Sequence, residues 1–157
     1  MMRKCFALIL SVLLLAIVVS HVQALAASQG PKTPPPPSEK TQVVAPLTTL
    51  WLSAWNCSIS QQSSNTVLLS GYADANIPVN QIWVILYLQR WNGSQWITVS
   101  NGYKSTGTNT PSITGKQTLT VTLGYYYRAM GNYQCYNNGI YDPSQPEVST
   151  SGYIYVD

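Results

Sequence analysis

Few side chains of this 157-residue chain could carry out acid–base or nucleophilic chemistry. The only histidine is His21, in an apolar N-terminal stretch, so the remainder has no imidazole for a Ser-His-Asp or Cys-His centre or for most zinc sites. Asp142 and Glu147 lie close together on a proline-containing loop, and could form a hydrolase carboxylate pair or half of a calcium site. Two solvated loop charges are the simpler interpretation, because Asp-Pro is by itself a turn signal. We therefore expect no enzyme activity, no cofactor and no metal site.

The cysteines indicate an oxidising compartment. Cys5 belongs to the N-terminal apolar stretch, which leaves Cys57 and Cys135 as one even pair. We predict that these two form a disulfide, and the alternative is two separate buried thiols. The bond would close a loop of roughly 80 residues, for which the chain-entropy model gives about 4–5 kcal/mol as an upper figure.

Residues 1–26 have the pattern of a secretory signal peptide. Two basic residues open it, an apolar run from Cys5 to Val19 follows, and Ala24-Leu25-Ala26 suits a peptidase that cleaves before Ala27. The run of about 15 residues is short of the ~20 that span a bilayer, so an uncleaved anchor is the less favoured alternative. We expect a protein that is secreted or held at the cell surface, with no membrane contact after cleavage.

Residues 27–46 differ in composition from what precedes and follows them. They contain the run Pro34–Pro37, further prolines and polar side chains, and so have no means of burying surface. We predict a disordered, proline-rich spacer. A role in holding the domain off a surface, or as a ligand for a proline-binding module, is the functional alternative.

The chain is poor in charge, with 8% charged residues against a usual figure of about 25%. From Leu47 onward four Lys/Arg face four Asp/Glu, so the net charge of this part is zero. A basic stripe for nucleic acid is therefore excluded. Solubility must rest on the abundant Ser, Thr, Asn and Gln.

Residues 47–157 form one predicted domain that is all-β. Apolar residues alternate with polar ones at a period of two, and turn signals recur about every ten residues, which is typical of an antiparallel β-sandwich of about seven strands. The expected strands are 50–60, 65–74, 82–91, 94–100, 116–123, 125–137 and 152–156.

Asn92-Gly93 is the strongest turn signal and fixes a predicted hairpin register. A two-residue turn places Trp91 opposite Ser94 and Leu88 opposite Ile97. Directly opposed residues share a face, so one apolar face is expected to lie in the core. Its members are Ile82, Val84, Leu86, Leu88, Ile97 and Val99.

The segment from Val121 through Gly124 to Tyr127 resembles the E–F corner of a fibronectin type III domain, and residues 82–96 are similar to the C–C′ hairpin of that fold. Together they resemble a group of small exported bacterial proteins of uncharacterised function that share a leader, a short spacer and one immunoglobulin-like sandwich. The resemblance implies that the Tyr127 hydroxyl bonds to the backbone near the corner. This sequence departs from the fibronectin type III pattern because it has no tryptophan between Val67 and Ala73.

The other face of the predicted sheet is aromatic and should face solvent. An exposed patch of this kind often marks a binding surface. Its predicted members are Trp83, Tyr87, Trp96, Tyr126, Arg128, Tyr153 and Tyr155.

The sequence thus favours an exported, non-enzymatic binding or adhesion module that contacts a glycan or a cell-surface protein through this face. A structural or self-associating envelope protein is the alternative, and purely structural pairing of the aromatic residues stays open.

Overall fold

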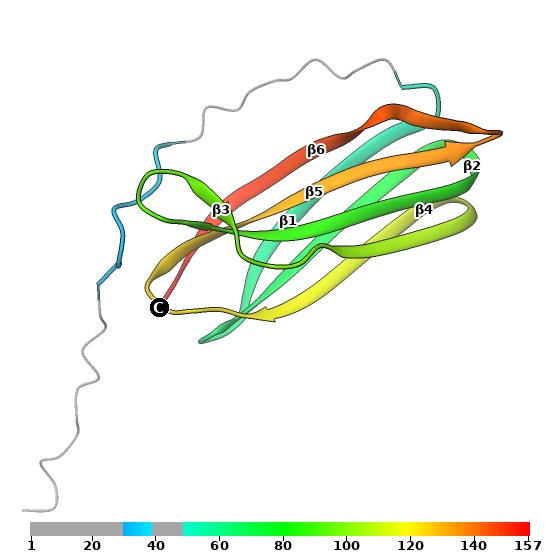
Figure 1. Ribbon diagram of the computed structural model, residues 1–157. Coiled ribbons are helices and arrows are strands. Elements are labelled where there is room, and N and C mark those ends of the chain that lie inside the picture. Colours follow the sequence, from blue (N-terminus) through cyan, green and yellow to red (C-terminus); the bar gives the residue numbers. More distant parts are fainter. Residues whose placement is uncertain (1–29, 39–48) are drawn as a thin grey trace, which may run out of the picture.

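The computed structural model describes residues 30–38 and 49–157, and the strands of this part form one antiparallel sheet without helices. Figure 1 shows the sheet curling around a single interior. Its strands are β1 (Leu52–Ser63), β2 (Thr66–Trp91), β3 (Trp96–Thr98), β4 (Tyr103–Thr120), β5 (Tyr125–Asn137) and β6 (Ile140–Val156). The all-β, antiparallel prediction is confirmed.

Some predictions fall outside the described residues. These are the signal peptide at 1–26 and the spacer residues 27–29 and 39–46. Within the described part, no helix is long and apolar enough to cross a membrane.

Strand β2 is a single long strand where the sequence predicted two. Its first part pairs with β1 and its second part with β5, while β4 pairs with both parts across a register break between Asp74 and Val79. Pro78 lies in this break and cannot donate to a ladder, which favours an irregularity there. The sheet turns over at this break, so that β1 packs against β5 and β6.

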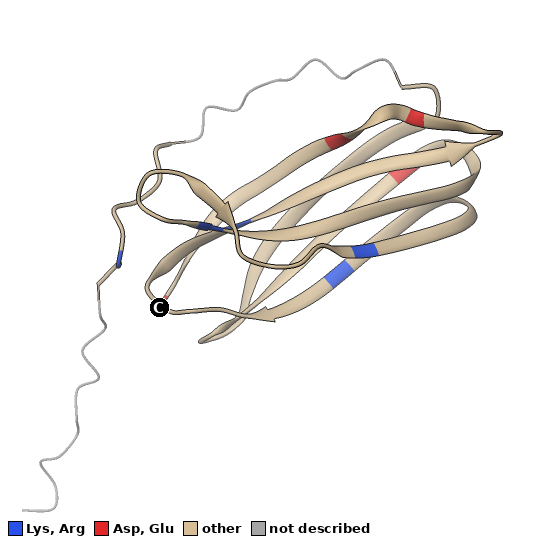
Figure 2. Ribbon diagram, viewed as in Figure 1, with Lys and Arg blue, Asp and Glu red and all other residues tan. Residues whose placement is uncertain are grey.

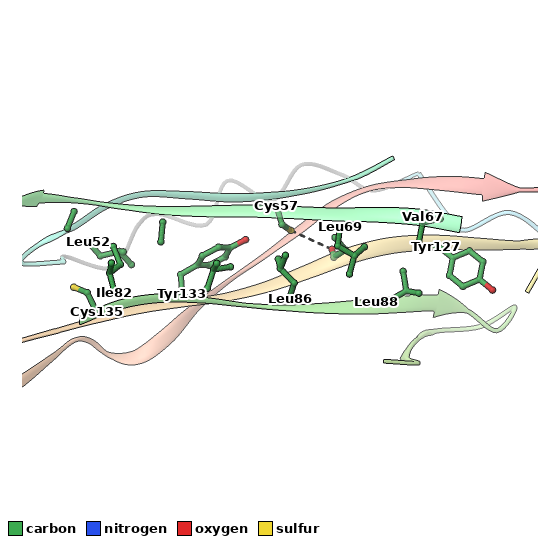
Figure 3. Packing of buried hydrophobic residues seen from close by; sticks show 14 of the residues in the cluster. Leu52, Cys57, Val67, Leu69, Ile82, Leu86, Leu88, Tyr127, Tyr133 and Cys135 are labelled. Carbon is green, nitrogen blue, oxygen red and sulfur yellow. Dashed lines mark hydrogen bonds between the residues drawn. The ribbon is translucent and has the colours of Figure 1, made fainter. Parts of the chain in front are cut away.

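The core lies between the two parts of β2 and the strands that cover them (Figure 3). Val67, Leu69 and Ala73 alternate inward from the first part, and Ile82, Val84 and Leu86 from the second, all fully buried. Period-two alternation therefore identified this core correctly.

The β2–β3 hairpin has a four-residue loop, so its predicted register is wrong by two residues. Trp91 pairs with Trp96 and Arg90 with Ile97. The Asn92 side chain accepts the backbone N–H of Ser94 and of Gln95, and this wider turn replaces the two-residue one. A shift of two keeps each side chain on its face. Val99, however, is 42% exposed and Ile97 is only half-buried, so neither of these two predicted core residues is part of the core.

The predicted disulfide is wrong, because Cys57 and Cys135 are both free and buried. The Cys57 thiol lies 3.7 Å from the carbonyl oxygen of Ala129. Cys135 stands six residues further along β5, or about 20 Å at the rise of a strand. Figure 3 shows Cys57 and Cys135 at different levels of the core. The offset of about 20 Å along β5 exceeds the Cα separation of about 7 Å that a disulfide tolerates.

The tyrosine predicted to form a corner does so. The Tyr127 hydroxyl donates to the carbonyl oxygen of Thr122 at 2.8 Å and lies 3.2 Å from the Thr122 N–H. The Tyr127 ring is buried, which raises the pKa of its hydroxyl although the backbone bond to Thr122 opposes the rise. The corner therefore fixes the β4–β5 turn to the core.

Candidate binding surface

A run of aromatic rings crosses the outer face of the sheet from β3 to β6. Cross-strand pairing places Trp91 beside Trp96 and Tyr126 beside Tyr155. The ring centroids are 5.5 Å apart between Trp91 and Trp96, 6.1 Å between Trp96 and Tyr153, 5.8 Å between Tyr126 and Tyr153, and 5.1 Å between Tyr126 and Tyr155. We call these five residues the aromatic ladder.

The Trp96 side chain extends across the sheet as far as Tyr153, the ladder residue on β6 that it contacts. The strand of Trp96, β3, is at the edge, separated from β6 by β2 and β5. The Arg128 guanidinium lies 4.5 Å from the Trp96 ring centroid, and Arg128 pairs with Tyr153 on β6. A cation over an indole face is a favourable contact, and it helps to fix the position of the Trp96 ring.

The buried Gln89 side chain fixes the position of Arg128. The Arg128 Nε donates to the Gln89 side-chain oxygen at 2.8 Å, and the Gln89 amide in turn lies 3.3 Å from the Met130 sulfur. Gln89 is buried under these groups. The guanidinium is therefore positioned before any ligand arrives, so binding would order few further side chains.

Five of the seven predicted surface residues come together here. Trp96, Tyr126, Tyr153 and Tyr155 are half-buried parts of the ladder, and Arg128 lies among them.

Trp83 and Tyr87 stand apart from the ladder. Trp83 is only 7% exposed, so its expected solvent exposure is wrong. Tyr141 packs edge-on against it at 6.2 Å, and the Lys104 ammonium lies 4.5 Å above its ring. Tyr87 is half-buried, and its ring lies close above Gly102, where a Cβ would approach within 2.7 Å. Both were assigned by strand phase alone, which cannot tell what covers a side chain.

Trp91 and Tyr141 are the aromatic residues that the sequence prediction missed. Trp91 is a buried ladder member that pairs directly with Trp96, and Tyr141 covers Trp83. For Trp91 a signal existed: the tendency of Asn92 to form a wider turn would have placed two tryptophans opposite each other. For Tyr141 no such local signal exists, because the contact depends on the path of β6.

The ladder carries little charge. Burial, then the Asp157 carboxylate and then Tyr126, raise the pKa of the Tyr155 hydroxyl, which therefore stays neutral at physiological pH. Figure 2 shows the few charged residues of the described part dispersed along the chain over several strands. A ligand on this face would be held mainly by contact and hydrogen bonding, not by electrostatic steering.

Of the Asp142–Glu147 pair considered for hydrolysis, the Asp142 carboxylate is already engaged in hydrogen bonds within the fold. Asp142 is buried, and its oxygens accept the backbone N–H groups of Leu50, Trp51 and Leu52 at 3.0, 2.6 and 2.9 Å. Burial alone would raise its pKa, but these bonds outweigh burial and lower the pKa. Asp142 therefore anchors the start of β1 as an ionised acceptor.

Cys135 lies next to Asp142, with 3.9 Å between the sulfur and a carboxylate oxygen. Burial, together with the Asp142 charge, raises the pKa of the Cys135 thiol to about 12, so it is a poor nucleophile. Residues 30–38 and 49–157 hold no group of three His, Cys, Asp or Glu side chains that could bind a metal ion.

No protein-family model matches the chain, and no curated protein matches it either. One solved structure that it resembles is described as the crystal structure of a protein from Archaeoglobus fulgidus. The identity is 11% and the TM-score 0.38, over 68% of this chain and 98% of the other.

Proposed function

We propose that the protein is an exported, non-enzymatic binding module that contacts a glycan through the aromatic ladder. The observation that carries the proposal is the set of half-buried rings held around a fixed guanidinium. Tyrosine and tryptophan offer flat apolar area with one hydrogen-bonding end, which suits a sugar ring with its apolar face and hydroxyl rim. A cell-surface protein is the other ligand class that fits such a surface.

Binding to insoluble cell-wall polysaccharide tests this proposal. We expect Tyr153→Ala and Trp96→Ala to weaken binding about fivefold or more, since each removes a central ring of the surface. The matched control is Tyr141→Ala, which removes an exposed ring next to Trp83, away from the ladder. Raising the salt from 0.1 to 0.5 M should change the affinity little, because the ligand is held by contact.

Two results would count against a glycan ligand. Loss of binding in all three variants alike would point to misfolding or to non-specific adhesion. Capture of an envelope protein by the wild type but not by Tyr153→Ala, with no polysaccharide bound, would assign the ladder to a protein partner.

We further infer that the curled sheet is a fibronectin type III-like sandwich. The paired halves of β2 and β4 and the Tyr127 corner support this. An experimental structure with β1 hydrogen-bonded to β6 along its length would argue against two separate layers.

Export is inferred from the leader pattern at residues 1–26. N-terminal sequencing of protein recovered outside the cytoplasm should begin at Ala27. A retained leader would support the membrane-anchored alternative.

A self-associating envelope component is the second candidate. An apolar tip at the end of the domain opposite the β2–β3 loop favours it, with Leu50, Ile77, Ile140 and Tyr141 each at least 43% exposed. Such a patch is unusual on a monomer. Sedimentation of Ile140→Ser beside the wild type tests this candidate, which predicts less association for the variant.

A further inference from the structure

Part of the proline-rich segment lies against the domain, at the end where the β2–β3 loop and the β4–β5 turn meet (Figure 1). The Lys32 N–H donates to the Gly124 carbonyl oxygen at 2.8 Å. The Lys32 stem passes 3.0 Å from the position that a Gly124 Cβ would take, so the missing side chain permits this approach. The Lys32 ammonium lies 5.3 Å from the Tyr125 ring centroid.

The next residues continue the contact on the neighbouring loop. Thr33 and Pro34 both lie within 3.8 Å of the position of a Cβ on Gly93. The Thr33 hydroxyl oxygen is shielded from solvent and has no hydrogen-bond partner among the described atoms. The segment therefore rests on two of the three described glycines at positive φ, Gly93 at 103° and Gly124 at 86°.

The burial of the segment has the period of a polyproline II helix. Thr33 is half-buried and Pro36 is buried, while every other described residue from 30 to 38 is exposed. A spacing of three is one turn of polyproline II, the conformation that a run of prolines favours. Docking of one face of an extended proline-rich chain on a domain surface is a recurrent mode of peptide recognition.

We propose that this end of the domain is a recognition site for an extended proline-rich segment, occupied by residues 30–38 of its own chain and open to the same residues of a second copy. The site makes the same contacts with its own segment and with the segment of a second copy, so exchange between copies loses no contact. The part of each copy from Leu47 onward has no net charge, so copies do not repel each other. Residues 30–38 are covalently joined to their own domain, so each site binds its own segment at low concentration. At higher concentration the segment of a second copy replaces it more often.

Exchange between copies produces an assembly. Reciprocal exchange between two copies closes a symmetric dimer, and exchange that continues from one copy to the next makes an open line. Neither form uses the aromatic ladder.

A labelled peptide of residues 30–38 tests the site. Its receptor is the full chain in which these residues are replaced by a Gly/Ser sequence of equal length, which empties the site and leaves the domain unchanged. We expect saturable binding, at least about tenfold tighter than to the unaltered chain, whose own segment competes. A Pro36→Ser peptide should bind several-fold more weakly, and the matched Pro37→Ser peptide should bind as the parent does. Absence of binding, or equal loss with both variant peptides, overturns the site.

Mixing two complementary chains tests exchange. The first is the Gly/Ser chain, which has a site but no segment. The second is Gly124→Asn, which keeps the segment and puts a side chain where the Lys32 stem lies; asparagine tolerates a positive φ. Sedimentation should show a one-to-one complex for the mixture and monomers for each chain alone.

The mixing experiment is repeated with Tyr125→Leu in place of Gly124→Asn, so that the result does not depend on one substitution that could impair folding. Thermal unfolding verifies that each chain is folded. If the mixture stays monomeric at concentrations at which the peptide saturates the site, exchange between copies is refuted. Adding Tyr153→Ala to both chains should leave the complex intact, so failure of the ladder proposal and failure of this one are distinguishable.

Discussion

Asp142 gives the sharpest test of how the domain is held together. One carboxylate accepts the N–H groups of three successive residues, Leu50 to Leu52, from a strand that is some 90 residues away in sequence. No other described part of β6 ties down the start of β1 in this way. We predict that Asp142→Asn, which changes shape least, destabilises the domain substantially.

The magnitude follows from the bonds. An amide retains one oxygen, so it can keep the bonds from Trp51 and Leu52 but turns a donor toward the Leu50 N–H. Loss of one charge-assisted bond costs about 1.5–3 kcal/mol. The two remaining bonds become neutral and are roughly halved in strength. The sum is about 3–6 kcal/mol, or about 12–24 °C in Tm for a domain of this size.

Urea unfolding followed by tryptophan fluorescence measures the effect at several pH values. The folded pKa of Asp142 is lowered below its ordinary 3.8, so its stabilisation is present above that value and is lost as the pH falls through the folded pKa. The difference between wild type and Asp142→Asn should therefore be full at pH 6 and shrink below about pH 4. Asp74→Asn, which removes the same charge from β2, is the matched control. A difference below about 0.5 kcal/mol at pH 6, or one that does not change down to pH 2, would refute the reasoning.

Three further predictions concern the core. Gly71→Ala should destabilise the domain by about 1–3 kcal/mol in urea unfolding, because the new Cβ would lie 2.7 Å from a core leucine, whereas Gly152→Ala meets nothing within 4 Å and should be near neutral. Tyr127→Phe removes the corner hydroxyl and should cost about 1–2 kcal/mol in the same assay; an unchanged midpoint would show that the corner is dispensable. Peptide mapping without reductant should find Cys57 and Cys135 as free thiols, with Cys135 alkylated at pH 8 only after unfolding, since burial raises its pKa to about 12. A linked peptide between the two would contradict the structure.

The sequence was most informative where a local pattern has one geometric meaning. Along residues 82–88, period two separates the even-numbered aliphatic residues from Trp83, Ile85 and Tyr87, and the even-numbered residues are indeed buried in the core. The Tyr127 corner likewise depends on a short segment whose own backbone supplies the partner. Strand β4 was largely missed before residue 116, because its Thr- and Ser-rich start is mostly exposed and carries no apolar pattern.

Other errors arose where the outcome depends on contacts between distant segments. Cys57 and Cys135 both point into the core, as their positions in the alternating pattern predict, but they lie at different positions along the strands. The alternating pattern tells which face a residue is on and not how far along the sheet it lies. Trp83 has the phase of a solvent-facing residue, yet Tyr141 from β6 and Lys104 from β4 cover it.

The sequence by itself determined an all-β chain with a neutral domain, an alternating core and a scarcity of catalytic groups, since composition and period two act locally along the chain. Only the tertiary structure decided which aromatic residues meet, what Asp142 binds and where residues 30–38 rest. These depend on register, on the turning of β2 near Pro78 and on the heights at which strands cross, which are set by packing over the whole sheet.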